Sequence, residues 1–282
     1  MNSEQQKLFI ACENGTLDKL DPKLLTQENF KVKDCYGNTP LLVAAYNDYL
    51  DQIPKNLLTQ KNLTMANQAG CTALRCAGIF GALRQIPRKF LIKENFITKY
   101  SDGATLLHET VELGHLDQIP EEFLTQENLT TEDKMGNTPM HYAAYKGHLG
   151  LIPQELLTRD NYTIKDQNGD TPLHYAFLGG HFDQIPRKFF SRGYLLIPGF
   201  NDQTPLHWSA RSKTLPSATK WTRLMGSSEK INDILDAIEL PEEARENLEK
   251  ALKLSRKLEI QRAQLSAAID KIRDQWSSEQ AS

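Results

Sequence analysis

A single 33-residue interval organises the first two-thirds of the chain. Threonines stand at positions 39, 72, 105, 138, 171 and 204, with no insertion between them. Each opens a version of one phrase, such as TPLLVAAYND from residue 39 and TPLHYAFLGG from residue 171. A strict period of this length predicts an array of repeated supersecondary units. An array favours binding as the function, and it accounts for most residues that could otherwise suggest catalysis.

The positions of each unit, counted from its threonine, have a helical interpretation. Threonine can cap a helix N-terminus, and the proline that often follows suits the first helical position. Small pairs such as Ala44 and Ala45 let neighbouring helices approach closely. Glycine at position 10, as in Gly147, ends a helix because it accepts a left-handed backbone. A D-x-x-G stretch, as at residues 133–136, supplies a turn between units.

This phrase resembles the ankyrin repeat, whose signature is G-x-T-P-L-H-x-A-A-x-x-G-H-L over 33 residues. The resemblance is clearest in GNTPMHYA at 136–143 and GDTPLHYA at 169–176. One further register begins at Gln6, so we expect about seven registers over residues 1–212, with atypical ends. The resemblance implies an all-α repeat solenoid of helix–turn–helix units joined by hairpin-like turns.

A regular proline sets the second half of each unit apart from the usual repeat. It occupies position 16 in five units: Pro54, Pro87, Pro120, Pro153 and Pro186. Proline inside a helix collides with the carbonyl four residues earlier. We therefore predict a broken second helix, with a 3₁₀-like turn around D-Q-I and then a brief helix starting at the proline. Such units resemble bacterial or viral ankyrin variants more than the common animal form.

All seven histidines fall on two repeat positions. Position 4 holds His108, His141, His174 and His207, and position 11 holds His115, His148 and His181. The resemblance implies that these side chains hydrogen-bond the turn between units, and serial units hold them too far apart for one metal ion. No phosphate-binding or nucleophile-elbow motif occurs. We therefore expect no catalytic residue, no cofactor and no metal.

Composition and charge limit the kinds of partner and the cellular setting that we expect for this chain. A net charge of −3 with mixed signs gives no footprint for nucleic acid. No apolar run approaches the ~20 residues that cross a bilayer, and the first residues lack a secretory pattern. Four cysteines without C-x-x-C spacing favour a reducing, cytoplasmic setting. Asn62, Asn128 and Asn161 open N-x-T triplets, but they share one repeat position, which favours a structural role over glycosylation.

The resemblance implies that a protein partner docks on the concave face, where positions 5, 8 and 9 of the first helix point outward. The candidate contact residues on or beside these positions are Tyr46, Ile79, Phe80, Glu109, Glu112, Met135, Tyr142, Tyr145, Lys146, Tyr175, Trp208 and Arg211. Tyr142, Tyr175 and Trp208 occupy position 5 of consecutive units and should form one aromatic ridge. Alternatively, these aromatics pack against their neighbours. Glu109 and Glu112, in the unit that opens at Thr105, argue against a continuous groove for nucleic acid.

The repeat pattern ends near residue 212. We predict a linker or partly packed cap over 213–228 and a helical or coiled-coil segment over 229–282, with one helix from about 241 to 276. Its apolar stripe contains Leu254, Leu258, Leu265, Ile269 and Ile272. This stripe either folds back as a hairpin or forms a coiled coil that makes a homo-oligomer.

These observations predict a non-catalytic protein-interaction module, with the terminal helices serving oligomerisation or a second contact. One alternative is the targeting arm of a bacterial or viral effector, or an inhibitor that occludes an enzyme. The other is an unrecognised activity in the C-terminal segment, which contains no histidine, cysteine or glycine-rich loop.

Overall fold

The computed structural model describes residues 1–212, 214, 216–236 and 242–279, excluding the side chains of 210, 218, 243, 244 and 268–279. The chain divides into two compact units, Met1–Gln167 and Asn168–Ser282. The described residues form helices and turns and contain no strand. The predicted all-α repeat architecture is therefore confirmed.

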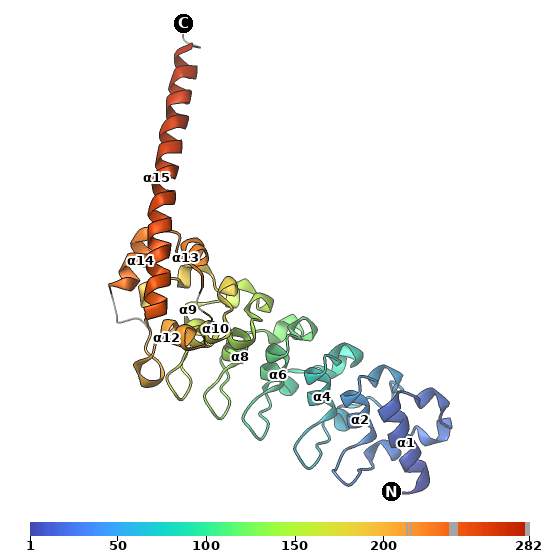
Figure 1. Ribbon diagram of the computed structural model, residues 1–282. Helices are drawn as coiled ribbons and strands as arrows, with labels where there is room; N and C mark the ends of the chain where they lie inside the picture. The colour runs from blue at the N-terminus through green and yellow to red at the C-terminus, as the bar shows by residue number, and fades with distance from the viewer. Residues whose placement is uncertain (213, 215, 237–241, 280–282) are drawn as a thin grey trace. The chain divides into compact units, whose positions relative to one another are not determined.

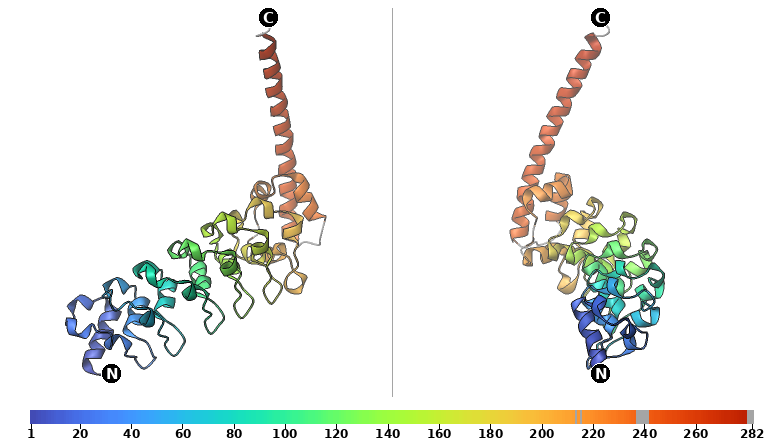
Figure 2. Two further views of the ribbon diagram at one scale, coloured as in Figure 1. Left: turned by 180° about the vertical axis from the view of Figure 1, so that it is seen from behind. Right: turned by 90° about the vertical axis from the view of Figure 1, so that its right-hand side faces the viewer.

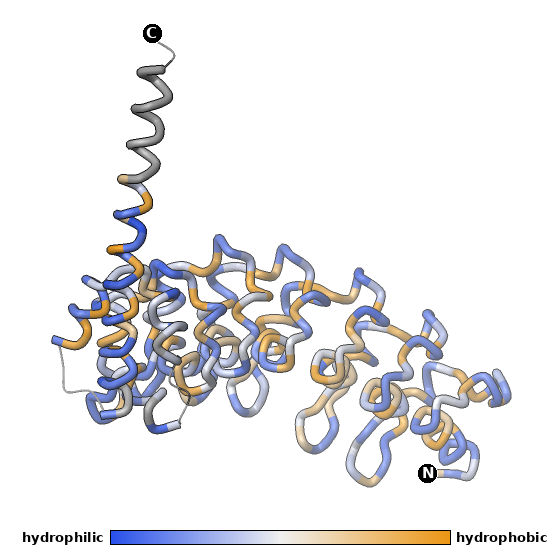
Figure 3. Tube along the Cα trace, turned by 45° about the horizontal axis from the view of Figure 1, so that its top comes forward, coloured by the Kyte–Doolittle hydropathy of each residue, from blue (hydrophilic) through white to orange (hydrophobic). Residues whose placement is uncertain are grey.

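The core of the first unit is a row of similar helices that each open one repeat. They are α1 (Ser3–Asn14), α2 (Pro40–Tyr46), α4 (Ala73–Ile79), α6 (Leu106–Glu112) and α8 (Pro139–Lys146). Each packs beside the next (Figure 1). Ala44 and Ala45 are fully buried, as the small-residue positions predict. In Figure 3 hydrophobic residues concentrate in these helices, and hydrophilic residues mark the outer turns.

The helix ends are capped as the sequence predicts. The Thr39 hydroxyl accepts a hydrogen bond from the Leu42 N–H at 3.2 Å. Where position 4 is histidine, its Nδ1 accepts from the threonine N–H, as for His108 and Thr105 at 3.0 Å. At the other end of α8, Gly147 has φ 77° and donates to the Ala143 carbonyl. Left-handed backbone of this kind favours glycine.

The second half of each unit is broken, as the proline predicts. Each repeat has a first 3₁₀ turn after its opening helix: η4 (Leu50–Gln52), η5 (Leu83–Gln85), η7 (Leu116–Gln118) and η9 (Leu149–Leu151). A second 3₁₀ turn follows the proline in three of these repeats: η6 (Arg88–Phe90), η8 (Glu121–Phe123) and η10 (Gln154–Leu156). Short α-helices follow: α3 (Gln60–Leu63), α5 (Lys93–Ile97), α7 (Gln126–Leu129) and α9 (Arg159–Thr163). The expected helix at the proline is thus a 3₁₀ turn, and the α-helix begins several residues later. The N-terminal repeat contains η1 (Leu17–Lys19), η2 (Pro22–Leu24) and η3 (Asn29–Lys31).

A buried asparagine fixes each short α-helix. The Asn62 side chain donates to the Leu57 carbonyl at 2.8 Å, and to Gln27 of the preceding unit at 3.0 Å. Asn161 repeats this arrangement with the Leu156 carbonyl and with Gln126. Both asparagines are at most 1% exposed. The N-x-T triplets therefore have a structural role, because a buried amide must be hydrogen-bonded.

The second unit continues the repeat and then changes character. It contains α10 (Pro172–Gly179), η11 (Phe182–Gln184), η12 (Arg187–Phe189), α11 (Arg192–Leu195), η13 (Phe200–Asp202) and α12 (Pro205–Arg211). Three helices follow: α13 (Ala218–Met225), α14 (Ser228–Leu235) and α15 (Glu242–Glu279). Trp221 of α13 is fully buried. The long helix α15 packs against α13 and α14 at its beginning and then extends away from them (Figure 2). The proposed domain boundaries stay predictions.

Candidate protein-binding face

The turns between the units form a regular ladder on one side of the first unit. Asp34 Oδ1 accepts hydrogen bonds from the Tyr36 and Asn38 N–H groups at 2.9 and 2.8 Å, and Gly37 takes φ 80°. The Gln68 N–H of the next turn donates to the Tyr36 carbonyl at 3.2 Å. This geometry explains the D-x-x-G pattern, because the carboxylate and the left-handed glycine together close the turn.

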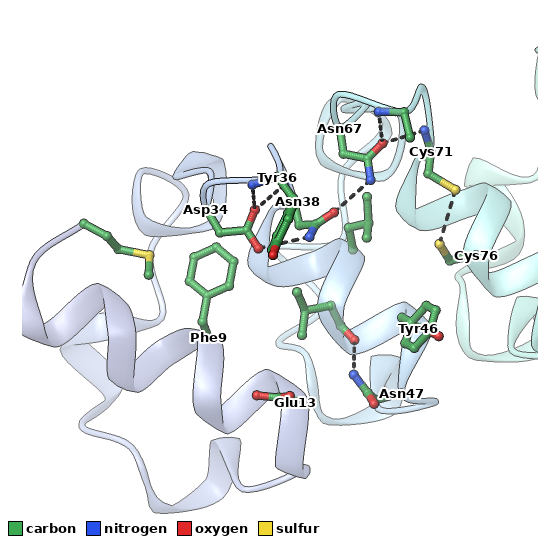
Figure 4. A pocket seen from close by; sticks show the side chains of 14 residues that line it. Phe9, Glu13, Asp34, Tyr36, Asn38, Tyr46, Asn47, Asn67, Cys71 and Cys76 are labelled. Carbon is green, nitrogen blue, oxygen red and sulfur yellow. Dashed lines mark hydrogen bonds between the residues drawn. The ribbon is translucent and has the colours of Figure 1, made fainter. Parts of the chain in front are cut away.

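A groove of about 570 Å³ lies between the first three repeats (Figure 4). Its walls come from α1, α2, the two turns at residues 34–38 and 67–71, and Cys76 of α4. Phe9 and Tyr46 line it together with Val43, so much of the wall is apolar. The carboxyl groups in its lining belong to Glu13 and Asp34. A mostly apolar concavity with a few polar groups is the usual form of a binding site.

Large apolar side chains are exposed at the rim of this groove. Tyr36 is 68% exposed and Tyr46 is 59% exposed. The Tyr46 ring packs edge-on against Phe80, with the ring centroids 4.7 Å apart. Ile79 beside Phe80 is half-buried. The structure thus brings together Tyr46, Ile79 and Phe80, the smaller apolar group that the sequence indicates. We call Tyr36, Tyr46 and Phe80 the aromatic rim.

An arginine that the sequence analysis did not single out joins the third and fourth repeats. Arg75 Nε donates to Glu109 at 2.8 Å, and its guanidinium also bonds Asp102 at 3.1 Å. The same group lies 4.1 Å from the centroid of the Tyr100 ring. Arg75 occupies repeat position 4, where His108 uses Nε2 to reach the Asn137 carbonyl of its next turn. His108 thus reaches the turn that closes its own unit, whereas Arg75 bonds both that turn and the first helix of the next unit, through charge.

Two side chains at position 5 are less accessible than a position that points outward implies. Cys76 is only 3% exposed. Glu109 has a side chain only 14% exposed and pairs with Arg75, so it is not an open acidic contact. Burial raises the pKa of Glu109, although Arg75 acts in the opposite direction. Cys76 packs beside Cys71 at its own helix start, and Glu109 is covered by its pairing with Arg75 of the preceding repeat.

The three aromatics at position 5 are half-buried. The Tyr142 hydroxyl donates to Asp133 at 2.8 Å, and its ring packs edge-on against His108 at 5.8 Å between centroids. Tyr142 belongs to the compact unit Met1–Gln167, whereas Tyr175 and Trp208 belong to the compact unit Asn168–Ser282. The centroids of the Tyr175 and Trp208 rings are 5.6 Å apart. These contacts favour the alternative that the aromatics pack against their neighbours.

The remaining predicted contact residues are accessible. Met135 and Tyr145 are 55% and 43% exposed, and Arg211 is also exposed. Lys146 lies over the Tyr145 ring at 5.5 Å and pairs with Glu112 at 3.2 Å. This exposed ion pair contributes little to stability, so both groups are available for a partner.

The stripe of the last helix divides into a buried and an exposed part. Leu248 and Ala251 are fully buried against the preceding helices, and Leu254 is half-buried. Leu258 and Leu265 are 37% and 63% exposed. The side chains of Ile269 and Ile272 lie outside the described residues. The first part of α15 therefore has the hairpin arrangement, and the described later part has no cover.

Two nearby thiols also line the groove. Cys71 precedes the capping Thr72, and Cys76 lies within α4, with 3.9 Å between their sulfur atoms. A hydrogen bond from Cys76 lowers the pKa of Cys71 to about 6, while the same pairing and burial raise the pKa of Cys76. No group of three potential metal ligands converges among the residues that the structure describes. None of the helices in that part of the chain combines the length and apolarity that crossing a membrane requires.

Comparison with known proteins supports the repeat assignment. The family model described as "Ankyrin repeats (3 copies)" matches residues 111–187. No curated protein matches the chain. The matched segment contains the helices α8 and α10, the left-handed glycine Gly147, and the position-4 histidines His141 and His174. Ankyrin repeats are typically non-catalytic and bind proteins, and the C-terminal helices lie beyond the match. Residues 111–187 of the chain therefore match the ankyrin-repeat family.

Proposed function

We propose that this protein is a non-catalytic binding module that holds a protein partner on the face formed by its first helices and turns. The observation that carries the proposal is the groove between the first three repeats, with the exposed aromatic rim beside it. Aromatic side chains dominate binding energy when a partner covers them. Tyr145, Lys146 and Met135 extend the same kind of surface on α8 and its preceding turn.

The test is partner capture by rim variants. A Tyr46→Ala/Phe80→Ala variant should lose capture from a lysate by tenfold or more, because each truncated hot-spot side chain costs about 1–2 kcal/mol. Leu151→Ala is the matched control, since Leu151 is 47% exposed in the second half of a unit. Equal capture by the rim variant, the control and the unmodified protein would refute the proposed face.

The predicted ridge supplies a second comparison. Tyr142→Ala, Tyr175→Ala and Trp208→Ala together should weaken capture less than the rim variant, because their rings are already engaged within the protein. A larger loss, with circular dichroism unchanged, would move the contact surface to these residues.

We further propose that the exposed part of α15 associates with a second copy or another protein. Leu258 and Leu265 leave an apolar stripe without cover on the described part of the helix. Light scattering on the full chain and on residues 1–257 tests this. A mass that falls to that of a monomer only on truncation supports association, and a monomeric full chain refutes self-association. We retain a cytoplasmic setting, and a role as the arm of a bacterial or viral effector, as proposals that partner identification would test.

A further inference from the structure

The two thiols of the groove differ in their surroundings. Cys71 is half-buried, stands outside the helix and faces the groove, whereas Cys76 is 3% exposed within α4. Their sulfur atoms are 3.9 Å apart (Figure 4). A disulfide has an S–S length of about 2.05 Å, so the sulfurs need approach by only about 1.9 Å. Both are free thiols here.

The neighbouring charges favour a thiolate at Cys71. The Cys76 thiol is its hydrogen-bond donor, the Arg75 guanidinium and the Thr72 N–H also stabilise negative charge, and Glu109 and burial oppose it. The balance places the pKa of Cys71 at about 6, so Cys71 is ionised at neutral pH. A thiolate with a second thiol beside it is the usual arrangement of a redox-sensitive site.

We propose that Cys71 and Cys76 form a redox modification site, at which a hydroperoxide converts the two thiols into an intramolecular disulfide. The Cys71 thiolate attacks the peroxide, its sulfur gains one oxygen as sulfenic acid, and the O–O bond breaks to release one water (or alcohol) after protonation. Cys76 then attacks that sulfur, the S–S bond forms, and the hydroxyl leaves as a second water with the Cys76 proton. The two thiols supply two electrons, and the peroxide accepts them. This inference does not depend on any protein partner.

The sequence allows a direct test on the full chain. Trypsin cleaves after Arg75, so Cys71 falls in peptide 62–75 and Cys76 in peptide 76–84. After equimolar hydrogen peroxide and alkylation, a non-reducing digest should contain these two peptides joined, and dithiothreitol should separate them. The exposed Cys35 is the control within the same molecule and should remain alkylated. Recovery of Cys71 as sulfinic acid with Cys76 still alkylated, a link between two chains, or no reaction would each overturn the proposal.

A second measurement isolates the role of Cys76. Alkylation of Cys71 should follow pH with a midpoint near 6, and in Cys76→Ala the midpoint should rise toward the ordinary thiol value of about 8.5. At pH 6 the thiolate fraction then falls about 160-fold. The greater nucleophilicity of the more basic thiolate offsets this in part, so the rate should fall about tenfold. Cys76→Ser is the second variant if the alanine substitution disturbs the circular dichroism. An unchanged rate at pH 6 would refute the hydrogen-bonded pair.

Discussion

Replacing Arg75 by methionine should destabilise the compact unit Met1–Gln167 more than replacing a member of any exposed ion pair. Methionine preserves most of the apolar stem over Tyr100 but leaves the Glu109 carboxylate without its cation. Both side chains of this pair are about 13–14% exposed. Removing one partner of a buried pair costs about 3–5 kcal/mol, and the lower end applies here because neither group is fully enclosed. Asp102 is 54% exposed and adds less than about 1 kcal/mol.

The expected loss is thus about 3 kcal/mol in the free energy of unfolding, measured by urea denaturation with circular dichroism. Repeat arrays can unfold in parts, so hydrogen exchange of the amides in α4 and α6 should report the same loss locally. Arg88→Met is the matched control. Its partner is Glu122, both side chains are more than half exposed, and the expected change is below about 0.5 kcal/mol.

The pH dependence gives an independent check on the mechanism. Without Arg75, burial holds the pKa of the Glu109 carboxyl in the folded state above its value in the unfolded state. Between these two pKa values, the folded state therefore binds more protons than the unfolded state. The defect of Arg75→Met should therefore be largest at neutral pH and shrink as pH falls through that raised pKa. Arg75→Met/Glu109→Gln should recover part of the loss at pH 7. A loss below about 0.5 kcal/mol in the single variant, or no recovery in the double variant, would refute the reasoning.

Three further perturbations test other parts of the fold. Asn161→Ala should lower the free energy of unfolding by about 1–3 kcal/mol in urea denaturation, because it leaves the Leu156 carbonyl unpaired. A variant as stable as the unmodified protein would contradict the structural role of the buried asparagine. Trp221→Ala should cost about 3–5 kcal/mol in the second unit, read by thermal unfolding, and a loss below about 1 kcal/mol would mean that α13 does not pack there. Burial lowers the pKa of His108. The stability that the neutral imidazole contributes is therefore present above pH ~6.5 and is lost as pH falls through the lowered pKa of the folded state. His108→Gln should make the free energy of unfolding depend less on pH over that range, and an unchanged pH dependence would contradict this reasoning.

The fold was predictable because the repeat imposes it locally. Threonine caps, small pairs and left-handed glycines each specify a piece of backbone, and position 16 proline forbids a regular second helix. The short α-helices were harder to predict, because they depend on an asparagine bonded to a carbonyl five residues earlier and to a glutamine in another unit. That second partner is invisible until the units are stacked.

The candidate site was predictable only in part. The group of Tyr46, Ile79 and Phe80 was identified because exposed positions follow the helix period. Arg75 and the thiol pair were missed, because unit-by-unit comparison treats deviations as noise. A signal was present: where Arg75 replaces the position-4 histidine, Tyr100 replaces the aspartate or asparagine of the turn that closes the same unit. Two deviations from the repeat within one unit can thus point to a contact between them.

The bonds within and between units also determine how such a chain can change in length. Each joins positions at a fixed separation: 29 residues from His108 to Asn137, 33 from Lys33 to Ala66, and 35 from Gln27 to Asn62. An added residue between two bonded positions preserves these bonds only if the chain bulges outward at a turn. Duplicating or deleting a whole 33-residue unit preserves all of them, because every partner keeps its separation.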